Sequence, residues 1–388
     1  MQSINSASVL HIGKYYWPHL GGIESHLRDL VRMQSSKLKV SVLVANDAAR
    51  FAEEHLDGAR ISRIPTLGAL SSMPITPTLP WNIARRKADI VHIHLPNPWA
   101  ALALLMSGHR GKIVITHHGD TLGRKNLRKI SDPFVVALMK RAAAIIVSSG
   151  RYLETSEELA GFRDRCRVIP LGLDRSAFES ADPVAMDEIR QKYGDRLILS
   201  VGRMVPYKGI RYLIESMRGV DAHLLHIGTG PLEPELARQV LESGMFSKVH
   251  LLGRVDNLGP YLHTAKMLVL PSISRAESFG IVQLEAMAAG LPIVNTNIES
   301  GVPEVSLHGV TGLTVPPANT IALAAAISLL LDDPALSAKL GEAGQARVRR
   351  EFSIERMAGD TMQVYSNVLN QENAVRTRHR LRLPEHQA

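Results

Sequence analysis

The sequence predicts an α/β protein with two doubly wound, Rossmann-like domains that face each other across a cleft. Three observations support this prediction. The chain has 388 residues, enough for two separate cores at roughly 100 to 200 residues per domain. Short β-branched runs alternate with helical patterns along the chain, which is typical of parallel sheets joined by crossover helices. The pattern begins again near residue 197, after a segment that contains Pro170 and Gly172.

Ten apolar runs are candidate strands. They lie at 9–13, 40–45, 90–94, 112–118 and 144–149, and then at 197–202, 223–228, 249–253, 267–272 and 292–296. None of them alternates strictly between apolar and polar residues. This is expected where helices cover both faces of a sheet.

The restart of the pattern sets the expected domains at 1–172 and 173–352. Segment 353–369 has apolar residues at near-helical spacing, so we expect a helix that packs back across the domains. Residues 370–388 are polar and include four arginines in "RTRHRLR". They predict a basic, flexible tail.

Charge is distributed unevenly along the chain, whose formal net charge is +8. Residues 1–170 hold 23 Lys and Arg against 13 Asp and Glu, or +10, and the remainder holds 22 against 24, or −2. The front half is therefore expected to meet an anionic partner.

Two absences narrow the class of protein. Cys166 is the single cysteine, so the chain has no intrachain disulfide and no cysteine metal cluster, and we expect a buried thiol. The longest apolar stretch, 321–331, is shorter than the roughly 20 residues that span a bilayer. No signal-peptide pattern precedes the first strand, so we expect a cytoplasmic protein.

The segment "ESFGIVQLEAMAAGLPIV" (277–294) predicts a phosphate site. Gly290 ends a helix pattern, and a buried stripe fits a helix from Ser278 to Ala289 directly after a strand. Unsatisfied N–H groups and the helix dipole at such a start favour a phosphate. The donors would be the backbone N–H groups of Phe279, Gly280, Ile281 and Val282.

Two carboxylates flank this helix start. Glu277 and Glu285 are eight residues apart, which along a helix separates the Cα atoms by about 12 Å. The acid and nucleophile of a retaining glycosidase need carboxyl groups about 5 to 5.5 Å apart, so this pair does not fit that role. We expect two separate contacts to one long ligand. The structural alternative is that Glu277 is an acidic residue at the helix start and Glu285 a solvated residue on the helix surface.

Here the sequence resembles the E-x7-E signature of the family 4 glycosyltransferases, which are retaining nucleotide-sugar enzymes of GT-B fold. Besides the two glutamates, the resemblance includes Phe279, Gly280, Ala286, Met287 and Gly290. It implies that Glu277 contacts hydroxyls of the donor sugar. It also implies that Glu285 binds the ribose of the nucleotide.

The segment "VGRMVPYKG" (201–209) follows the first strand of the second half. It places Arg203 and Lys208 on a loop where two cations can neutralise a diphosphate. It lacks the glycine and Ser or Thr that flank the lysine of a Walker loop, and two solvated cations are the structural alternative. Similar family segments place this Arg and Lys on the donor diphosphate. "IGTGP" (227–231) and "GRVDN" (253–257) also resemble family loops, and the latter would put Val255 at the base site.

In the front half, "THHGD" (116–120) ends a strand. His118 matches a family histidine at the mouth of the active site, which reaches the donor sugar or steadies developing charge. If the match is shifted by one residue, His117 takes this position instead of His118. The structural alternative is a histidine that only makes local hydrogen bonds at the end of its strand. Asp120 is expected to orient the imidazole or an acceptor hydroxyl. His92 and His94 are expected to be structural.

Gly21 and Gly22 lie between the first strand and an amphipathic segment. Alone, they fit a turn as well as a ligand loop. "GGIESH" resembles the N-terminal glycine loop of the family, which approaches the diphosphate and the acceptor. A side chain at Gly22 is therefore expected to block the donor–acceptor junction more than the fold.

A basic cluster lies at 124–129, with two pairs of cations at i,i+4 spacing. Its members are Arg124, Lys125, Arg128 and Lys129. Family members that act on lipid-linked acceptors often dock on membranes through such patches, so peripheral contact with the cytoplasmic membrane face is one expectation. A solvated helix face is the other.

The resemblance implies transfer, with retention, of a hexose-type sugar from a nucleoside diphosphate donor, either GDP-mannose or a UDP-sugar. The acceptor would be a hydroxyl of a carbohydrate or lipid-linked molecule, in glycolipid, cell-surface polysaccharide or glycoconjugate synthesis. The sequence has no D-x-D motif, so we expect no metal and no cofactor, with Arg203, Lys208 and the helix start stabilising the departing phosphate. No nucleic-acid partner is expected.

Three other functions remain open. A nucleotide-sugar epimerase of the same fold would use a similar donor site. A nicotinamide-dependent oxidoreductase needs G-x-G-x-x-G on its first strand-to-helix turn, and "GKYYWPHLGG" does not supply that order. A non-catalytic nucleotide-binding protein is the third alternative.

Overall fold

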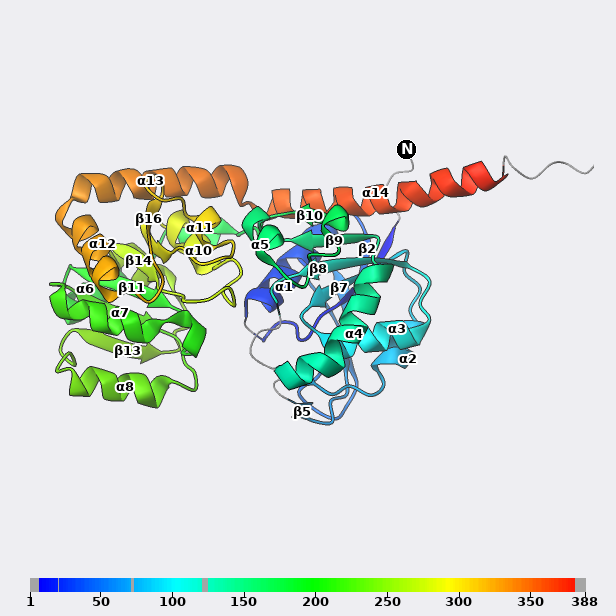
Figure 1. Cartoon of the computed structure of the whole chain (residues 1–388), viewed down its shortest axis with the longest axis horizontal. Coiled ribbons are helices and arrows are strands. Elements are labelled where there is room, and N and C mark those ends of the chain that lie inside the picture. Colours follow the sequence, from blue (N-terminus) through cyan, green and yellow to red (C-terminus); the bar gives the residue numbers. More distant parts are fainter. Residues whose placement is uncertain (1–6, 20, 71–72, 121–124, 381–388) are drawn as a thin grey trace, which may run out of the picture. The chain divides into compact units, whose positions relative to one another are not determined.

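The computed structural model describes residues 7–19, 21–70, 73–120 and 125–380, with the side chains of 70, 125–131 and 371–380 left out. The chain forms two compact units (Figure 1). The first contains residues up to Ser148, Ser156–Pro170 and the chain from Ile354, and the second contains Ser149–Thr155 and Leu171–Ser353. The chain thus passes between the units more than once. The sequence predicts boundaries at 172 and 352 and a final helix that packs back across the domains, but it does not predict that Ser149–Thr155 belongs to the second unit.

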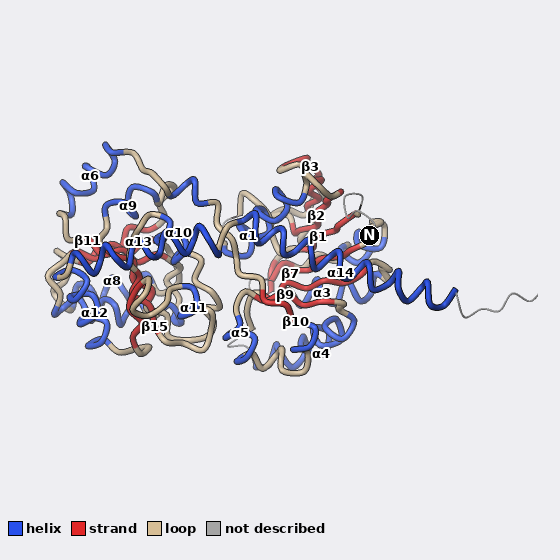
Figure 2. The backbone as a smooth tube through the Cα atoms, turned by 90° about the horizontal axis from the view of Figure 1, so that it is seen from above, coloured by secondary structure: helices blue, strands red, loops and turns tan. Residues whose placement is uncertain are grey.

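A sheet of eight strands forms the centre of the first unit. Figure 2 shows several of its strands side by side in red, and only the β3–β4 pair is antiparallel. Its strands, in spatial order, are β10 (Cys166–Val168), β9 (Ala144–Val147), β8 (Lys112–His117), β7 (Ile90–Leu95), β1 (Ser8–Ile12), β2 (Lys39–Ala45), β4 (Ala59–Ile64) and β3 (Ala52–Leu56). The other elements of this unit are α1 (Gly22–Gln34), α2 (Leu79–Ala84), α3 (Pro98–Ser107), α4 (Lys125–Arg141), η2 (Arg163–Arg165), α14 (Ile354–Arg380) and the hairpin of β5 (Ala69–Leu70) and β6 (Met73–Pro74).

Helix α14 returns from the end of the chain to the first unit. It packs beside α1 and buries Met357, Tyr365 and Val368 in the core of this unit. The helix continues to Arg380, so the expectation that it ends at 369 is wrong. The polar residues after 369 include no Gly or Pro before Pro384, and polar helix formers do not end a helix by themselves.

The second unit contains a six-stranded, wholly parallel sheet. Its spatial order is β13 (Val249–Gly253), β12 (His223–Ile227), β11 (Leu197–Val201), β14 (Met267–Leu270), β15 (Ile293–Thr296) and β16 (Gly312–Val315). Its helices are α5 (Gly150–Thr155), η3 (Arg175–Phe178), α6 (Pro183–Tyr193), η4 (Pro206–Lys208), α7 (Ile210–Ser216), η5 (Met217–Gly219), α8 (Glu233–Glu242), α9 (Gly259–Thr264), α10 (Val282–Ala288), α11 (Val302–Val305), α12 (Thr320–Asp332) and α13 (Pro334–Glu351).

All ten predicted strands are present, and the two doubly wound α/β units are confirmed. The apolar runs predicted them because helices cover both faces of a parallel sheet. Strands β3 and β4 were missed because their sequences, AEEHL and ARISRI, are rich in charged residues. Strand β3 has the exposed position at the edge of its sheet, where a polar strand is tolerated.

Each sheet has a point where the strand order reverses. In the first unit β1 lies between β7 and β2, and in the second unit β11 lies between β14 and β12. Ligands of such sheets bind outside the carboxyl ends of the strands at the reversal. The loops after β1 and β7, and those after β11 and β14, are therefore the places to look for a site.

No single helix among the described residues has both the length and the apolar composition to cross a membrane. The pair α12 and α13 passes that test only jointly, with a bend of 99° between the two helices. The apolar face of α12 packs into the core of the second unit through Leu323, Ile327 and Leu330. Cys166 is buried as expected, and burial raises the pKa of its thiol to about 11.

Candidate functional site

Two loops of the second unit meet where its strand order reverses. One follows β11 and contains Arg203 and Lys208, and the other follows β14 and contains Glu277 and Gly280. Their strands pair directly, with Ile198 opposite Met267, so the two loops leave the same edge of the sheet as neighbours. The fold therefore brings together residues far apart in the sequence that the motifs had singled out separately.

Lys208 and Glu277 form an ion pair in this site. The Lys208 Nζ lies 2.5 Å from Glu277 Oε2, and each side chain is close to nine-tenths buried. Burial alone would lower the pKa of Lys208, but the charge and hydrogen bond of Glu277 outweigh it and raise the pKa. Ser272, which the sequence analysis missed, donates its hydroxyl to the same carboxylate oxygen at 3.2 Å.

Both groups keep capacity for a ligand. An ammonium group has three donors, and a carboxylate accepts about four hydrogen bonds. Lys208 uses one donor on Glu277, and Glu277 accepts from Lys208 and Ser272. Lys208 can therefore bind an anion, and Glu277 can accept a hydrogen bond from a hydroxyl, while the ion pair between them stays formed.

Glu285 lies on α10, the helix that follows the loop of Glu277, and is partly buried. Burial raises the pKa of its carboxyl group to about 7, although the nearby charge of Lys208 pulls that pKa down. The charge of Glu285 also helps to raise the pKa of Lys208. Its carboxyl group is therefore balanced between the protonated and ionised forms near neutral pH.

The expected helix from Ser278 to Ala289 is wrong at its start. Helix α10 begins at Val282, because Gly280 has a φ of 72° in the left-handed region and interrupts a right-handed helix. A Cβ at this position would lie 2.7 Å from Leu270 Cδ2. The end of the helix is as predicted, since Gly290 has a φ of 84° and its N–H bonds to Met287 O at 3.0 Å.

The turn before α10 still presents backbone donors. Within the described residues, no acceptor contacts the N–H groups of Phe279, Gly280, Ile281 and Val282. Phe279 itself is buried and packs edge-on against Phe352, with ring centroids 6.1 Å apart. The donors thus belong to a glycine turn held by the core and not to a full helix start.

Arg203 is exposed on the loop after β11 and has no ion-pair partner in the part of the chain that the structure describes. Its charge is close enough to Tyr207 to favour the ionised phenol, although burial dominates and raises the pKa of that tyrosine. An unpaired guanidinium beside a buried ammonium group concentrates positive charge at one sheet edge.

Glycines make this loop arrangement possible. A Cβ at Gly228 would lie 2.0 Å from Gly202 O, and one at Gly230 would lie 2.5 Å from Met204 O. The loops of "VGRMVPYKG" and "IGTGP" therefore touch backbone to backbone, and Met204 N–H donates to Thr229 O at 3.0 Å. Gly202 also makes room for Lys208, whose Nζ would be 3.1 Å from a Cβ there.

Val255 follows β13 and is partly buried against the core of the second unit. The structure places it two strands away from β11 on the same sheet. Its proposed contact with a nucleotide base stays a prediction.

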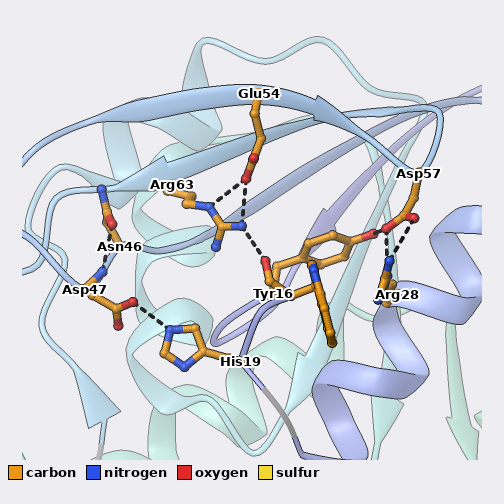
Figure 3. Close-up of polar contacts among 9 residues, drawn as sticks. Tyr16, His19, Arg28, Asn46, Asp47, Glu54, Asp57 and Arg63 are labelled. Carbon is orange, nitrogen blue, oxygen red and sulfur yellow. Dashed lines mark hydrogen bonds and ion pairs between the residues drawn. The ribbon is translucent and has the colours of Figure 1, made fainter. Parts of the chain in front are cut away.

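In the first unit, the loop that precedes Gly21 is firmly held (Figure 3). Tyr16 Oη donates to Asp57 Oδ2 at 3.0 Å, and Arg28 Nε donates to the same oxygen at 3.0 Å. Arg63 pairs with Glu54 and donates to the carbonyl of Trp17. These contacts hold Tyr16 and the backbone of Trp17 in place.

The two glycines themselves are not required by the backbone. Gly21 has a φ of 174°, an extended value open to any residue, and a Cβ there would meet only the flexible end of Glu24. A Cβ at Gly22 would meet nothing within 4 Å. The packing of the described residues thus gives no reason for glycine at position 22.

His118 follows β8 and lies in a cluster of buried histidines. Its Nε2 is 3.2 Å from His94 Nδ1, and the two rings are stacked with an interplanar angle of 20°. Burial lowers the pKa of both imidazoles well below the usual value, so both are neutral at pH 7. His94 thus contacts a predicted site residue directly, and its expected structural role stays a prediction.

Its neighbours have other partners. His117 Nε2 lies 3.2 Å from Glu158 Oε2, and Asp120 Oδ1 accepts from Ser156 Oγ at 2.7 Å. His117, Asp120 and Glu158 each place one potential metal ligand within 4.8 Å of the others. The structure therefore brings Asp120 near His117, whereas His118 contacts His94.

The basic cluster falls largely outside the description. Arg124 is not among the described residues, and the side chains of Lys125, Arg128 and Lys129 on α4 are likewise left out. Its contact with a membrane stays a prediction.

Models of two protein families match the chain. "Glycosyltransferase Family 4" matches residues 20–177 and "Glycosyl transferases group 1" matches residues 184–347. The two matches fall on the front and back parts of the chain, on either side of residue 180.

Two curated relatives and one solved structure are similar to the chain. A D-rhamnosyltransferase of Pseudomonas aeruginosa is 33% identical over 269 residues, covering 69% of this chain and 70% of the relative. The O-antigen chain mannosyltransferase C of Escherichia coli is 27% identical over 376 residues, covering 94% of this chain and 100% of the relative. The HepE protein of Anabaena, solved with UDP-glucose, has a TM-score of 0.77 at 20% identity, covering 93% of this chain and 100% of that one.

Proposed function

Since the chain belongs to the family 4 glycosyltransferases of GT-B fold, we propose that it transfers a hexose-type sugar, with retention, from a nucleoside diphosphate donor to a hydroxyl acceptor. The observation that carries the proposal is the ion pair of Lys208 and Glu277 where the strand order of the second unit reverses, with Arg203 exposed on the same loop as Lys208. Two cations and a carboxylate at such an edge suit a sugar diphosphate.

Each group has a role in binding the donor. Arg203 and the free donors of Lys208 would hold the diphosphate, with help from the backbone N–H groups of the Gly280 turn. Glu277 would accept hydrogen bonds from hydroxyls of the sugar. Glu285 would accept from the ribose, and Val255 would line the base.

The chemical step needs charge stabilisation at the leaving group. The bond between the anomeric carbon and the phosphate oxygen breaks, and the acceptor oxygen bonds to that carbon on the same face. The leaving phosphate takes the proton of the acceptor. Arg203 and Lys208 stabilise the charge that forms on this phosphate, and loss of one such donor costs about 10² to 10³ in rate.

No step is assigned to a metal, because the sequence has no D-x-D motif and Arg203 and Lys208 would supply the positive charge at the phosphate. In the first unit, Gly22 and His118 are proposed to contact the donor sugar, and Asp120 the acceptor hydroxyl. Open space at Gly22 supports this role, because glycine there answers no packing need of the fold.

The relatives support an acceptor in surface-glycan synthesis. One is named a D-rhamnosyltransferase and the other an O-antigen chain mannosyltransferase. We propose GDP-linked deoxyhexose or mannose donors first and UDP-sugars second, with a carbohydrate or lipid-linked acceptor.

A donor panel tests the proposal. The chain is incubated with UDP-, GDP- and ADP-sugars, with and without lipid-linked and oligosaccharide acceptors, and the nucleotide products are separated. Acceptor-dependent release of nucleoside diphosphate is the expected result. An altered sugar still linked to its nucleotide would instead identify an epimerase, and tight binding without turnover would identify a binding protein.

Matched variants sharpen the panel. Arg203→Ala is expected to lose turnover, whereas Arg218→Ala is not, because Arg218 is also exposed but follows α7 and pairs with Glu215 of that helix. Equal loss in both variants would remove the assignment of Arg203 to the diphosphate.

A further inference from the structure

A chain of hydrogen bonds runs inward from His118 in the first unit. His118 Nε2 contacts His94 Nδ1 at 3.2 Å, and His94 Nε2 contacts His11 Nδ1 at 3.2 Å. His11 Nε2 then contacts Gln34 Oε1 at 2.9 Å. We call these four residues the histidine chain. All four side chains are buried.

The inner end of the histidine chain is anchored by α14. Gln34 Nε2 donates to Tyr365 Oη at 3.3 Å, and this oxygen lies 2.5 Å from His92 Nδ1. His92 Nε2 in turn contacts Thr116 Oγ1 at 2.7 Å. Because the amide nitrogen of Gln34 is used on Tyr365, its oxygen is the group that faces His11.

This anchor fixes the direction of every bond in the histidine chain. A neutral imidazole has one donor and one acceptor nitrogen, and the amide oxygen can only accept. His11 therefore carries its proton on Nε2 and accepts on Nδ1, so His94 must donate from its own Nε2. Since His94 donates from Nε2, its Nδ1 can only accept, so His118 must donate from its own Nε2. Nδ1 of His118 is then left with a lone pair.

The neutrality of the rings follows from their surroundings. Burial lowers the pKa of His11 to about 4 and lowers the pKa of His94 and His118 well below the usual value. Neighbouring histidines lower the pKa of His94 and His118 further. The Gln34 hydrogen bond raises the pKa of His11, but burial has the larger effect. The rings are therefore neutral, and the hydrogen bonds of the histidine chain select one neutral tautomer of each ring.

Building on the proposed function, in which His118 faces the donor sugar, we propose that His94, His11 and Gln34 are positioning residues for His118. They hold His118 in the tautomer protonated on Nε2. The ring then offers the Nδ1 lone pair to a sugar hydroxyl, which donates its proton to it. Gln34 acts through two intervening rings and does not touch the substrate.

A metal site is the competing interpretation of the same cluster. His26, His94 and His118 each place a ring nitrogen within 4.8 Å of the others, and both ring nitrogens of His26 lack a partner among the described residues. A metal needs the three lone pairs aimed at one point. Instead, His94 Nδ1 and His118 Nε2 face each other at hydrogen-bond distance, and His26 meets the His118 ring edge-on at 77°.

The test reads the tautomers directly. The full chain is labelled with ¹⁵N-histidine, and long-range proton–nitrogen correlation spectra are recorded at pH 7, with His118 assigned from a His118→Gln spectrum. We expect the signal pattern of a neutral ring protonated on Nε2. In Gln34→Leu we expect His118 to shift to the form protonated on Nδ1, because His11 loses the acceptor that set the direction.

A matched control exists in the second unit. His223 Nδ1 lies 3.2 Å from His250 Nε2 in a stacked pair, the same contact as that between His94 and His118. His250→Leu should leave the His118 pattern unchanged. His94→Leu should give a mixture of the two tautomers at His118.

Two results would overturn the proposal. One is the finding that His118 of the wild-type protein is protonated on Nδ1. This result is decisive even if the Gln34→Leu variant does not fold. The other is a shift of the His94 and His118 nitrogens on addition of one equivalent of ZnCl₂, which would make the cluster a metal site.

Turnover separates this inference from the proposed function. If the chain transfers sugar, Gln34→Leu should lower kcat about tenfold, the value of one hydrogen bond. If no donor is used at all, the proposed function fails, and the tautomer pattern still decides the role of the histidine chain.

Discussion

Replacing Lys208 by methionine is expected to stop turnover and, separately, to destabilise the second unit. The ammonium group sits 2.5 Å from Glu277 Oε2 with both side chains close to nine-tenths buried. Methionine keeps much of the volume of the lysine stem but removes the charge. The two effects have different causes and can be measured apart.

The effect on rate comes from the leaving phosphate. Loss of one charged donor costs about 2.7 to 4 kcal/mol in the transition state, or about 10² to 10³ in kcat. The effect on stability comes from Glu277, which is left buried and unpaired at a cost of about 3 kcal/mol, the lower end for breaking a buried pair. For a unit of this size, that cost lowers Tm by roughly 6 to 12 °C.

The double variant Lys208→Met, Glu277→Gln separates these effects. Removing both charges should recover most of the lost Tm, because no uncompensated charge remains. Turnover should stay low in both variants, since neither retains the cation at the phosphate. Initial rates and differential scanning calorimetry measure the two quantities on the same samples.

Lys248→Met is the matched control, since Lys248 is also partly buried in the second unit but donates only to Val220 O at 3.0 Å. It should keep its turnover. If the double variant instead regained both wild-type Tm and wild-type turnover, the ion pair would be a structural contact and the role of Lys208 at the diphosphate would be refuted.

Three other changes follow from the geometry. Gly22→Val should keep the wild-type Tm, because a Cβ there meets nothing within 4 Å, yet lower turnover about a hundredfold by displacing the sugar; a fully active variant would reduce Gly22 to a turn residue. The affinity for a nucleoside diphosphate, measured by calorimetric titration, should weaken as pH falls from 8 to 6. The reason is that burial raises the pKa of Glu285 to about 7, and the protonated carboxyl group accepts hydrogen bonds from ribose hydroxyls less well. Glu285→Gln should flatten this pH dependence, and an unchanged slope would exclude Glu285 as its source. Gly209→Ala should lower the free energy of unfolding by about 2 to 5 kcal/mol, because φ is 65° and the Cβ would lie 2.2 Å from Pro271 O. Gly219→Ala, with open space around it, is the stability control, and equal loss in the two glycine variants would contradict the packing argument.

Much of the fold could be predicted because ten of its strands carry a local signal, although β3, β4, β10 and β16 were not predicted. The ten β-branched runs all form strands, since a parallel sheet covered on both faces requires apolar residues at consecutive positions. Strand order has no such local signal. The charged strands β3 and β4 had none either, because their side chains pair with one another across the sheet edge, as Arg63 does with Glu54.

The site was predictable as separate motifs but not as contacts. Nothing local links Lys208 to Glu277, which meet only because β11 pairs with β14. Ser272 gave no signal, because a serine after a strand is common. The start of α10 was misplaced because a helical stripe does not reveal that Gly280 adopts a positive φ.

The histidine chain was the least predictable feature. His92 and His94 alternate on one strand, which places them on the same face. Their partners come from distant elements, because His92 contacts Tyr365 of α14 and His94 contacts His11 of β1, which in turn contacts Gln34 of α1. Gln34 and Tyr365 are 331 residues apart in the sequence. Only the return of α14 to the first unit brings them together.

The central claim is that a sugar diphosphate binds where the strand order of the second unit reverses. A crystal structure of the chain with a nucleoside diphosphate tests it most directly. We expect phosphate density within hydrogen-bond reach of Lys208 Nζ and the Arg203 guanidinium, with the ribose on Glu285. A nucleotide bound at any other sheet edge, with Lys208 still paired only to Glu277, would contradict it.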